Sequence, residues 1–170
     1  MKIEIKYEGQ LTQPEHLLVD KLSAEVFPPE GTALKWSKVD WHVLLWEGDE
    51  LASHIEIIER TATVDSQPVR LGGIGGVATR VQWRRRGLAE AALRTAQAFL
   101  HEKLAVEFGL LVCGEIMIHY YAQFSWKLLE RTMLIDQPQG KVTYSEPIMI
   151  LPVCKQDWPA GEIDLCGLPW

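Results

Sequence analysis

The segment from Gly76 to Glu90 constrains this chain more than any other. Val77-Ala78-Thr79 has the pattern of a buried strand's end, and a short polar turn then leads through Gly87 into an amphipathic helix. A helix entered in this way has unpaired backbone N–H groups at its N-terminus, where the helix dipole favours an anion. Three arginines stand just before this helix: Arg84, Arg85 and Arg86. Backbone donors and fixed positive charge together predict a pyrophosphate cradle.

Two common phosphate-binding loops are excluded. No Lys-Ser or Lys-Thr follows the glycine, as a Walker loop requires, and the Gly-x-Gly-x-x-Gly of a dinucleotide-binding fold is missing. The alternative for the arginines is a solvated turn or a nucleic-acid patch. A chain with a net charge of −6 lacks the broad basic face that nucleic-acid binding needs. We therefore expect no nucleic-acid partner.

The residues Arg84-x-x-Gly87-x-Ala89 match the Arg/Gln-x-x-Gly-x-Gly/Ala signature of the GNAT N-acetyltransferases, and the chain resembles that family. In the family this loop wraps the pyrophosphate of acetyl-CoA, and the preceding strand holds the pantetheine arm by main-chain hydrogen bonds. The resemblance implies acetyl-CoA as co-substrate and a direct transfer of its acetyl group to an amine. The coenzyme-binding residues it implies are Val77, Ala78, Thr79, Arg84, Arg85, Arg86, Gly87, Leu88 and Ala89.

At 170 residues the chain has the length of a single domain, 1–170, with a sizeable core. It has no run of about eighteen apolar residues, and its alternating first six residues are typical of a strand rather than a secretory signal. We therefore expect a cytoplasmic protein with no membrane partner. The cysteines, odd in number and scattered, are expected to be reduced thiols: Cys113, Cys154 and Cys166. The spacing of the histidines predicts no metal site.

Hydrophobic periodicity and turn residues predict the order of elements. Strands are expected over 3–7, 41–46, 51–58, 69–79 and 108–113, and helices from 12 or 13 to a stop at 27–31, over 88–100 and over 115–124. A closing hairpin of 126–134 and 142–151 and a tail of 152–170 that folds back complete the chain. The fold class is α/β (α+β), with one central, mixed, mostly antiparallel sheet flanked by helices. This order of elements is the order of the GNAT fold.

Glycines interrupt the strand that leads to the loop: Gly72, Gly73, Gly75 and Gly76. Because glycine weakens a strand, four in five positions need a reason. A structural bulge is one explanation, and a close approach of the backbone to a ligand is the one we favour. The resemblance implies a bulge here that splays two strands apart, so that the thioester lies between them.

The segment from Tyr121 to Trp126 resembles the family's second landmark, Tyr-x-x-x-Gly-Phe/Trp, with Ser125 in place of the glycine. The resemblance implies that Tyr121 protonates the departing thiolate of coenzyme A. The alternative is that Tyr121 packs in the core like Phe124. Tyr120 is the less favoured donor, because neighbouring residues of a helix point in different directions.

The general base stays open. An alkylamine is protonated at pH 7, so a base must remove a proton before attack. Many GNATs carry a glutamate on the strand before the cofactor loop, but 73–76 holds no carboxylate. The candidates are His54 and Glu56, which share one face of a strand, and Glu115. The missing strand carboxylate also keeps open a non-catalytic acyl-CoA-binding module.

The segment Leu168-Pro169-Trp170 is expected to be docked, because exposed chain ends are usually polar. The aromatic plate and terminal carboxylate of Trp170 would suit an amine-bearing sugar, and the chain is similar here to the aminoglycoside 2'-N-acetyltransferases. The alternative is that the tail only covers a sheet edge. We expect Trp170, Glu56 and His54 to bind the substrate.

The negative net charge fits a cationic acceptor, because it attracts amines to a cleft. The predicted acceptor is a primary amine on a small cationic molecule, with an aminoglycoside-like amino sugar first. A longer acyl chain, as in the nodulation acyltransferases, is the near alternative. Both a monomer and a homodimer stay open.

Overall fold

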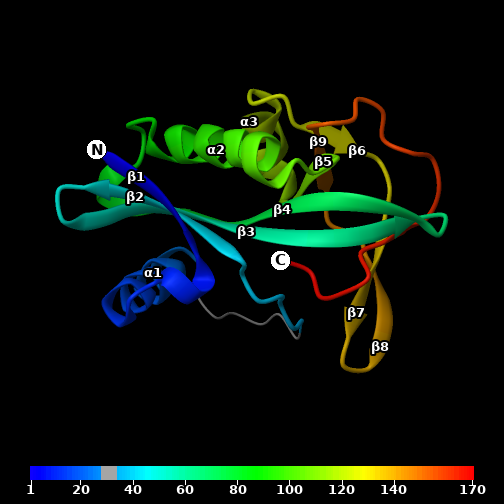
Figure 1. Ribbon diagram of the computed structural model, residues 1–170, viewed down its shortest axis with the longest axis horizontal. Helices are drawn as coiled ribbons and strands as arrows, with labels where there is room; N and C mark the ends of the chain where they lie inside the picture. The colour runs from blue at the N-terminus through cyan, green and yellow to red at the C-terminus, as the bar shows by residue number, and fades with distance from the viewer. Residues whose placement is uncertain (28–33) are drawn as a thin grey trace.

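The computed structural model describes residues 1–27 and 34–170 (Figure 1). The strands in these ranges are β1 (Lys2–Tyr7), β2 (Trp41–Glu47), β3 (Glu50–Val64), β4 (Gln67–Thr79), β5 (Phe108–Val112), β6 (Lys127–Leu129), β7 (Met133–Gln137), β8 (Gly140–Tyr144), β9 (Ile148–Pro152) and β10 (Ile163–Asp164). The α-helices are α1 (Gln13–Val26), α2 (Leu88–Phe99) and α3 (Ile118–Ala122). Short helical turns are η1 (Glu8–Gln10), η2 (Val81–Trp83), η3 (Leu100–Leu104) and η4 (Glu115–Met117).

The strands form one mixed, mostly antiparallel sheet in the order β6-β9-β5-β4-β3-β10-β7-β8, and β2 and β1 continue it beside the first half of β3. Parallel pairs occur only between β4 and β5 and between β10 and β7 in the described ranges. Helix α2 lies on one face of the sheet and α1 on the other, and the chain end lies on the α1 side (Figure 1). The predicted fold class is confirmed.

Helix α1 begins where the sequence predicts. Thr12 is its N-cap: its hydroxyl accepts a hydrogen bond from the backbone N–H of Glu15, and the Glu15 carboxylate accepts one from the N–H of Thr12. Leu22 from this helix is fully buried against the sheet. The predicted stop signal falls largely on residues 28–31, which lie outside the described residues.

The predicted closing hairpin was wrong in detail, because each of its two long strands is divided into two shorter strands. β6 and β9 pair with one another beside β5, whereas β7 and β8 form a separate hairpin that pairs with the tail strand β10. The chain bends between β6 and β7 and between β8 and β9 because each half pairs with a different neighbour. Strand β3 is longer than predicted, since its second half pairs with β4 and its end with β10. The helix expected over 115–124 is the turn η4 followed by the short α3.

Candidate active site

Arg80 anchors the start of the predicted cofactor loop. The sequence pattern did not single out this residue. Its guanidinium is buried, donates from Nε to the carbonyl of Leu51 at 2.8 Å and pairs through Nη1 with Glu25 at 2.7 Å. Beyond it, Arg84 donates from Nε to the carbonyl of Thr79 at 3.1 Å. Arg80 holds the end of β4, and Arg84 folds the turn back onto that strand.

Helix α2 begins at this loop with an open N-terminus. Gly87 is the N-cap, with a left-handed φ of 76°, and no side chain caps the helix. A Cβ on Gly87 would meet no atom within 4 Å. The first N–H groups of α2 are therefore free to bind an anion, with the arginines 84–86 beside them. Among these, Arg86 stacks 4.8 Å from the ring centroid of Trp83.

Strands β4 and β5 diverge into a wedge. Their parallel pairing covers only Leu71–Gly73 and Phe108–Leu110 in the described register. The rest of β4 stays paired with β3, and the rest of β5 stays paired with β9. The main-chain groups on the inner edges of the wedge are therefore left for another partner, such as an extended pantetheine chain.

Trp170 closes the narrow end of this wedge. Its indole Nε1 donates to the carbonyl of Leu110 at 3.3 Å, and its ring occupies the space where a Cβ on Gly73 would lie. The guanidinium of Arg60 stacks 5.5 Å from the ring centroid and donates to the carbonyl of Leu168. The end of the tail is docked against the sheet, and the ring lies on the face opposite α2.

Glu56 lies at the bulge of β4 on this same face. The register between β3 and β4 shifts between His54 and Glu56, and Gly76 takes a left-handed φ of 53° there. A Cβ on Gly76 would lie 2.8 Å from Oε2 of Glu56. The pKa of this carboxyl is raised, first by burial and then by the charge of Glu8. A partly buried carboxyl with a raised pKa beside the wedge is a better proton acceptor than an ordinary surface glutamate.

The other two base candidates have different surroundings. His54 is fully buried, its Nε2 lies 2.9 Å from Nδ1 of His42, and burial lowers its pKa to about 3. Nε2 of His42 in turn lies 2.5 Å from Oε2 of Glu8. Glu115 is exposed on η4. Glu8 and His42 were missed because no local motif marks them; only the pairing of β1, β2 and β3 brings them to His54.

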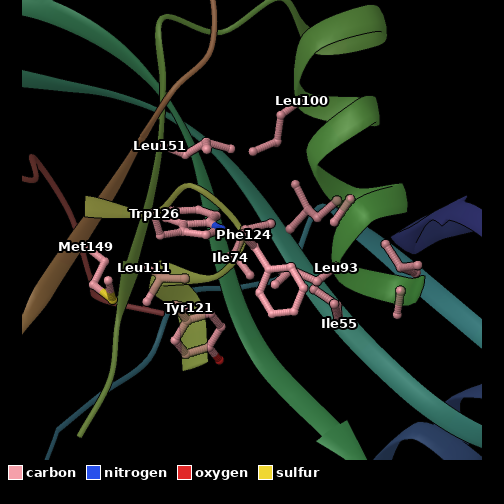
Figure 2. Packing of buried hydrophobic residues seen from close by; sticks show 14 of the residues in the cluster. Ile55, Ile74, Leu93, Leu100, Leu111, Tyr121, Phe124, Trp126, Met149 and Leu151 are labelled. Atoms are coloured by element: carbon pink, nitrogen blue, oxygen red, sulfur yellow. The ribbon is translucent and has the colours of Figure 1, made fainter. Parts of the chain in front are cut away.

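Tyr121 is both a core residue and a candidate acid. Its ring is part of the buried cluster with Phe124 and Trp126, and its hydroxyl oxygen points away from Leu111 and Trp126 (Figure 2). Burial raises its pKa far above the ordinary value, and the nearby Cys113 contributes. The phenol therefore stays protonated at neutral pH. The two alternatives for this residue are compatible, because the ring packs while the hydroxyl stays available.

Comparison with protein-family models gives a match over the part of the chain that holds these features. The model described as "Acetyltransferase (GNAT) domain" matches residues 14–129, which include the wedge, the loop and α3. The chain belongs to the GNAT acetyltransferases. It is accordingly an acyl-CoA-dependent N-acetyltransferase with acetyl-CoA as its co-substrate.

Solved structures share this GNAT fold at low sequence identity. An acyl-CoA N-acyltransferase from Pseudomonas aeruginosa is 18% identical with a TM-score of 0.65, over 88% of this chain and 98% of that one. A GNAT acetyltransferase from Brucella melitensis, solved with acetyl-CoA, is 14% identical with a TM-score of 0.64, over 95% and 94%. FeeM, an N-acyl amino acid synthase from uncultured soil microbes, is 9% identical with a TM-score of 0.64, over 89% and 92%. At these identities the likeness shows the fold alone.

The glycines of β4 in this GNAT domain correct one prediction. We expected their backbone to approach a ligand, but the chain's own side chains fill the space beside three of them. A Cβ on Gly72 would meet Leu100, one on Gly73 the ring of Trp170, and one on Gly76 the carboxylate of Glu56. The bulge, which we ranked second, is present.

None of the helices in the described ranges of this acetyltransferase is long and apolar enough to cross a bilayer. Those same ranges contain no group of three His, Cys, Asp or Glu side chains that could hold a metal ion.

Proposed function

We propose that this acetyltransferase moves an acetyl group from acetyl-CoA to a primary amine on a small cationic acceptor, with an aminoglycoside-like amino sugar as the first candidate. The observation that carries the proposal is the partly buried Glu56 carboxylate beside Gly76, on the face opposite the coenzyme loop. With a base on that face and an anion cradle on the other, the two substrates would bind on opposite sides of the wedge.

The coenzyme would be held from the α2 side. Main-chain groups of Val77, Ala78 and Thr79 on the inner edge of β4 are suited to the pantetheine arm. The pyrophosphate would be held by the residues of the loop and the first turn of α2: Arg84, Arg85, Arg86, Gly87, Leu88 and Ala89. The uncapped N-terminus of α2 and the open space around Gly87 support this fit. Bound there, acetyl-CoA supplies an activated acyl thioester.

Glu56 would be the general base. A base works best when its pKa lies near the operating pH, and burial moves the pKa of Glu56 upward from its usual acidic range. In the described residues, no hydrogen bond occupies its carboxylate, so it can accept a proton from an incoming ammonium. His54 is the weaker candidate for direct proton removal, since burial strongly favours its neutral ring.

Tyr121 would be the general acid that protonates the coenzyme A thiolate. Its raised pKa keeps the proton on the phenol until the thiolate forms. Cys113, which directly follows β5, packs against the buried cluster that contains Tyr121, so the phenol would lie near the diverging end of β5. Tyr120, whose ring packs edge-on against Tyr121 at 5.2 Å, is the matched neighbour for testing this role.

Trp170 would form the floor of the acceptor site. Its ring lies on the Glu56 side of the sheet, and an aromatic face attracts a cationic amine. The net charge of −6 supports a cationic acceptor, since a negative field concentrates amines. The three unpaired cysteines are in keeping with a cytoplasmic location, which we also propose.

A longer acyl donor is the second candidate. The fold neighbour FeeM is by its title an N-acyl amino acid synthase. The test is a screen in which the purified protein is mixed with acetyl-CoA or octanoyl-CoA and a panel of amines, and free thiol is measured. We expect thiol release with acetyl-CoA and amino sugars. Release only with octanoyl-CoA would favour the second candidate. If none of the amines gives thiol release with either donor, the result would point to a non-catalytic acyl-CoA-binding module.

A further inference from the structure

A line of polar contacts runs from the buried centre of the sheet to the surface. His54 is fully buried on β3, and its Nε2 lies 2.9 Å from Nδ1 of His42 on β2. Nε2 of His42 lies 2.5 Å from a carboxylate oxygen of Glu8. The side chain of Glu8 is 46% exposed. The line of contacts therefore begins at the buried His54 and ends at Glu8, which is in contact with solvent.

Glu8 sets the tautomers of both rings. An ionised carboxylate only accepts hydrogen bonds, so His42 donates from Nε2. Burial lowers the pKa of His42, so the ring is neutral and keeps a lone pair on Nδ1. His54 must then donate from Nε2 to that lone pair. This leaves Nδ1 of His54 without a proton, and that atom is buried with no hydrogen-bond partner among the described residues. An unpaired buried acceptor is costly, so it calls for an explanation.

His54, whose Nδ1 is unpaired, lies on the same face of the sheet as Glu56. His54 precedes Glu56 by two residues on one face of β3. His42 is the direct cross-strand partner of Glu56 in the register of β2 and β3, which places their Cβ atoms about 5 Å apart. The three residues thus lie next to one another on the face of the sheet where the acceptor would bind.

Acetylation of an alkylammonium requires two proton acceptors. The nitrogen loses two protons on its way to an amide, and one carboxylate holds only one. We propose that Glu8, His42 and His54 form a proton relay behind Glu56 that takes up the first of these protons. This inference rests on the proposed function, because it assigns the relay a task in that reaction.

The transfer conserves every proton. An N–H bond of the ammonium breaks as an O–H bond forms on Glu56, and Glu56 passes this proton to Nδ1 of His54. His54 releases its Nε2 proton to Nδ1 of His42, and His42 releases its Nε2 proton to Glu8. Glu56 is then ionised again for the second proton. When the product leaves and water enters, Glu56 gives up the second proton, which replaces through water the one that Tyr121 lost to the thiolate. The first proton then returns from Glu8 along the same path to Glu56 and water, and both tautomers are restored.

Nitrogen NMR of the protein labelled with 15N-histidine tests the relay without any reaction. At neutral pH we expect His42 and His54 to be neutral rings that carry their protons on Nε2. A proton on Nδ1 of His54 would overturn the proposal, because the acceptor end of the line would be blocked.

Kinetics of Glu8→Gln test the task. Glutamine can still accept the hydrogen bond from His42 but cannot store a proton, so a merely structural role would survive. With an amine that the wild type acetylates, we expect kcat to fall roughly 10- to 100-fold, at the lower end of the loss expected when a general base itself is removed. The KM for acetyl-CoA should be unchanged, and Glu8→Asp should restore part of kcat. The matched control is Glu4→Gln, which removes a carboxylate from β1 that pairs with Lys2.

The outcomes separate the two proposals. Full kcat in Glu8→Gln, with wild-type tautomers, overturns the relay and leaves the acetyltransferase function in place. A wild-type protein that acetylates no amine overturns the proposed function, and the relay loses its task with it.

Discussion

The Cβ of any residue other than glycine at position 76 would lie 2.8 Å from Oε2 of Glu56. Gly76 also has a left-handed φ of 53°, which an L side chain rarely adopts. The glycine therefore does two things: it makes the bulge of β4, and it leaves room for the carboxylate beside the wedge. Glu56, the proposed base on β3, can occupy its position because Gly76 on β4 has no side chain.

Gly76→Ala should separate these effects. The left-handed conformation should cost about 1–2 kcal/mol of folding free energy, and the new methyl group should displace the carboxylate and lower kcat. Gly48→Ala is the matched control, because Gly48 has φ 58° but open space around its Cβ position. Urea unfolding and kinetics of both variants check this. Equal kcat values in the two variants would contradict the role of the contact.

Glu56→Gln should remove most of the turnover, by about 10²–10⁴ if proton removal is its whole role. In the wild type, kcat/KM should fall as the pH drops through the raised pKa of Glu56, and this acid limb should vanish in the variant. The folded protein holds the proton more tightly than the unfolded chain, so the wild type loses stability as the pH rises from the unfolded pKa to the folded one. The variant should therefore be more stable than the wild type at pH 7 and alike at pH 4.

The control for this change is Glu59→Gln, an exposed carboxylate on the same strand. It should keep both kcat and the acid limb. An acid limb that persists in Glu56→Gln would assign the titration to another group.

Tyr121→Phe should lower kcat by about 10²–10⁴ while coenzyme binding stays nearly intact, because the ring still fills its place in the core. Steady-state kinetics and acetyl-CoA titration check this. Tyr120→Phe serves as the control and should keep its turnover. An equal loss of kcat in both variants would contradict the assignment of the general acid to Tyr121.

Gly87→Glu should abolish the stabilisation by acetyl-CoA. In the wild type, ligand at a hundredfold excess over Kd should add about 2.7 kcal/mol. A glutamate at the N-terminus of α2 would place a negative charge against the pyrophosphate. The control is Gly140→Glu at the first residue of β8, where the φ is also positive and the space is open. Full thermal shift in Gly87→Glu would show that the loop is not the cradle.

Trp170→Ala should cost about 3–5 kcal/mol of stability, because the ring is buried against Gly73 and Leu110. If the ring is also the floor of the acceptor site, the acceptor KM should rise with little change for acetyl-CoA. Trp158→Ala removes another tail tryptophan, packed on Phe108, and should cost stability without raising that KM. Equal acceptor KM values would leave Trp170 as a cover for the sheet.

The sequence by itself determined the parts whose chemistry is local. The loop from Arg84 to Ala89 could be predicted because strand end, glycine and helix start are contiguous, and backbone geometry alone opens the N–H groups of α2. The Thr12 cap of α1 and the turns of the long hairpins follow from the same short-range rules.

Only the tertiary structure decided which residues come together on the face of the sheet that carries Trp170 and Glu56. Trp170 reaches Gly73 because the tail pairs through β10 with β3 and β7, and no local pattern predicts such long-range pairing. The split of the closing hairpin has the same cause. The sequence ranked Glu56 and His54 alike, since both lie on one face of β3. Packing separated them: the bulge at Gly76 places Glu56 beside the wedge, whereas β2 and η1 enclose His54.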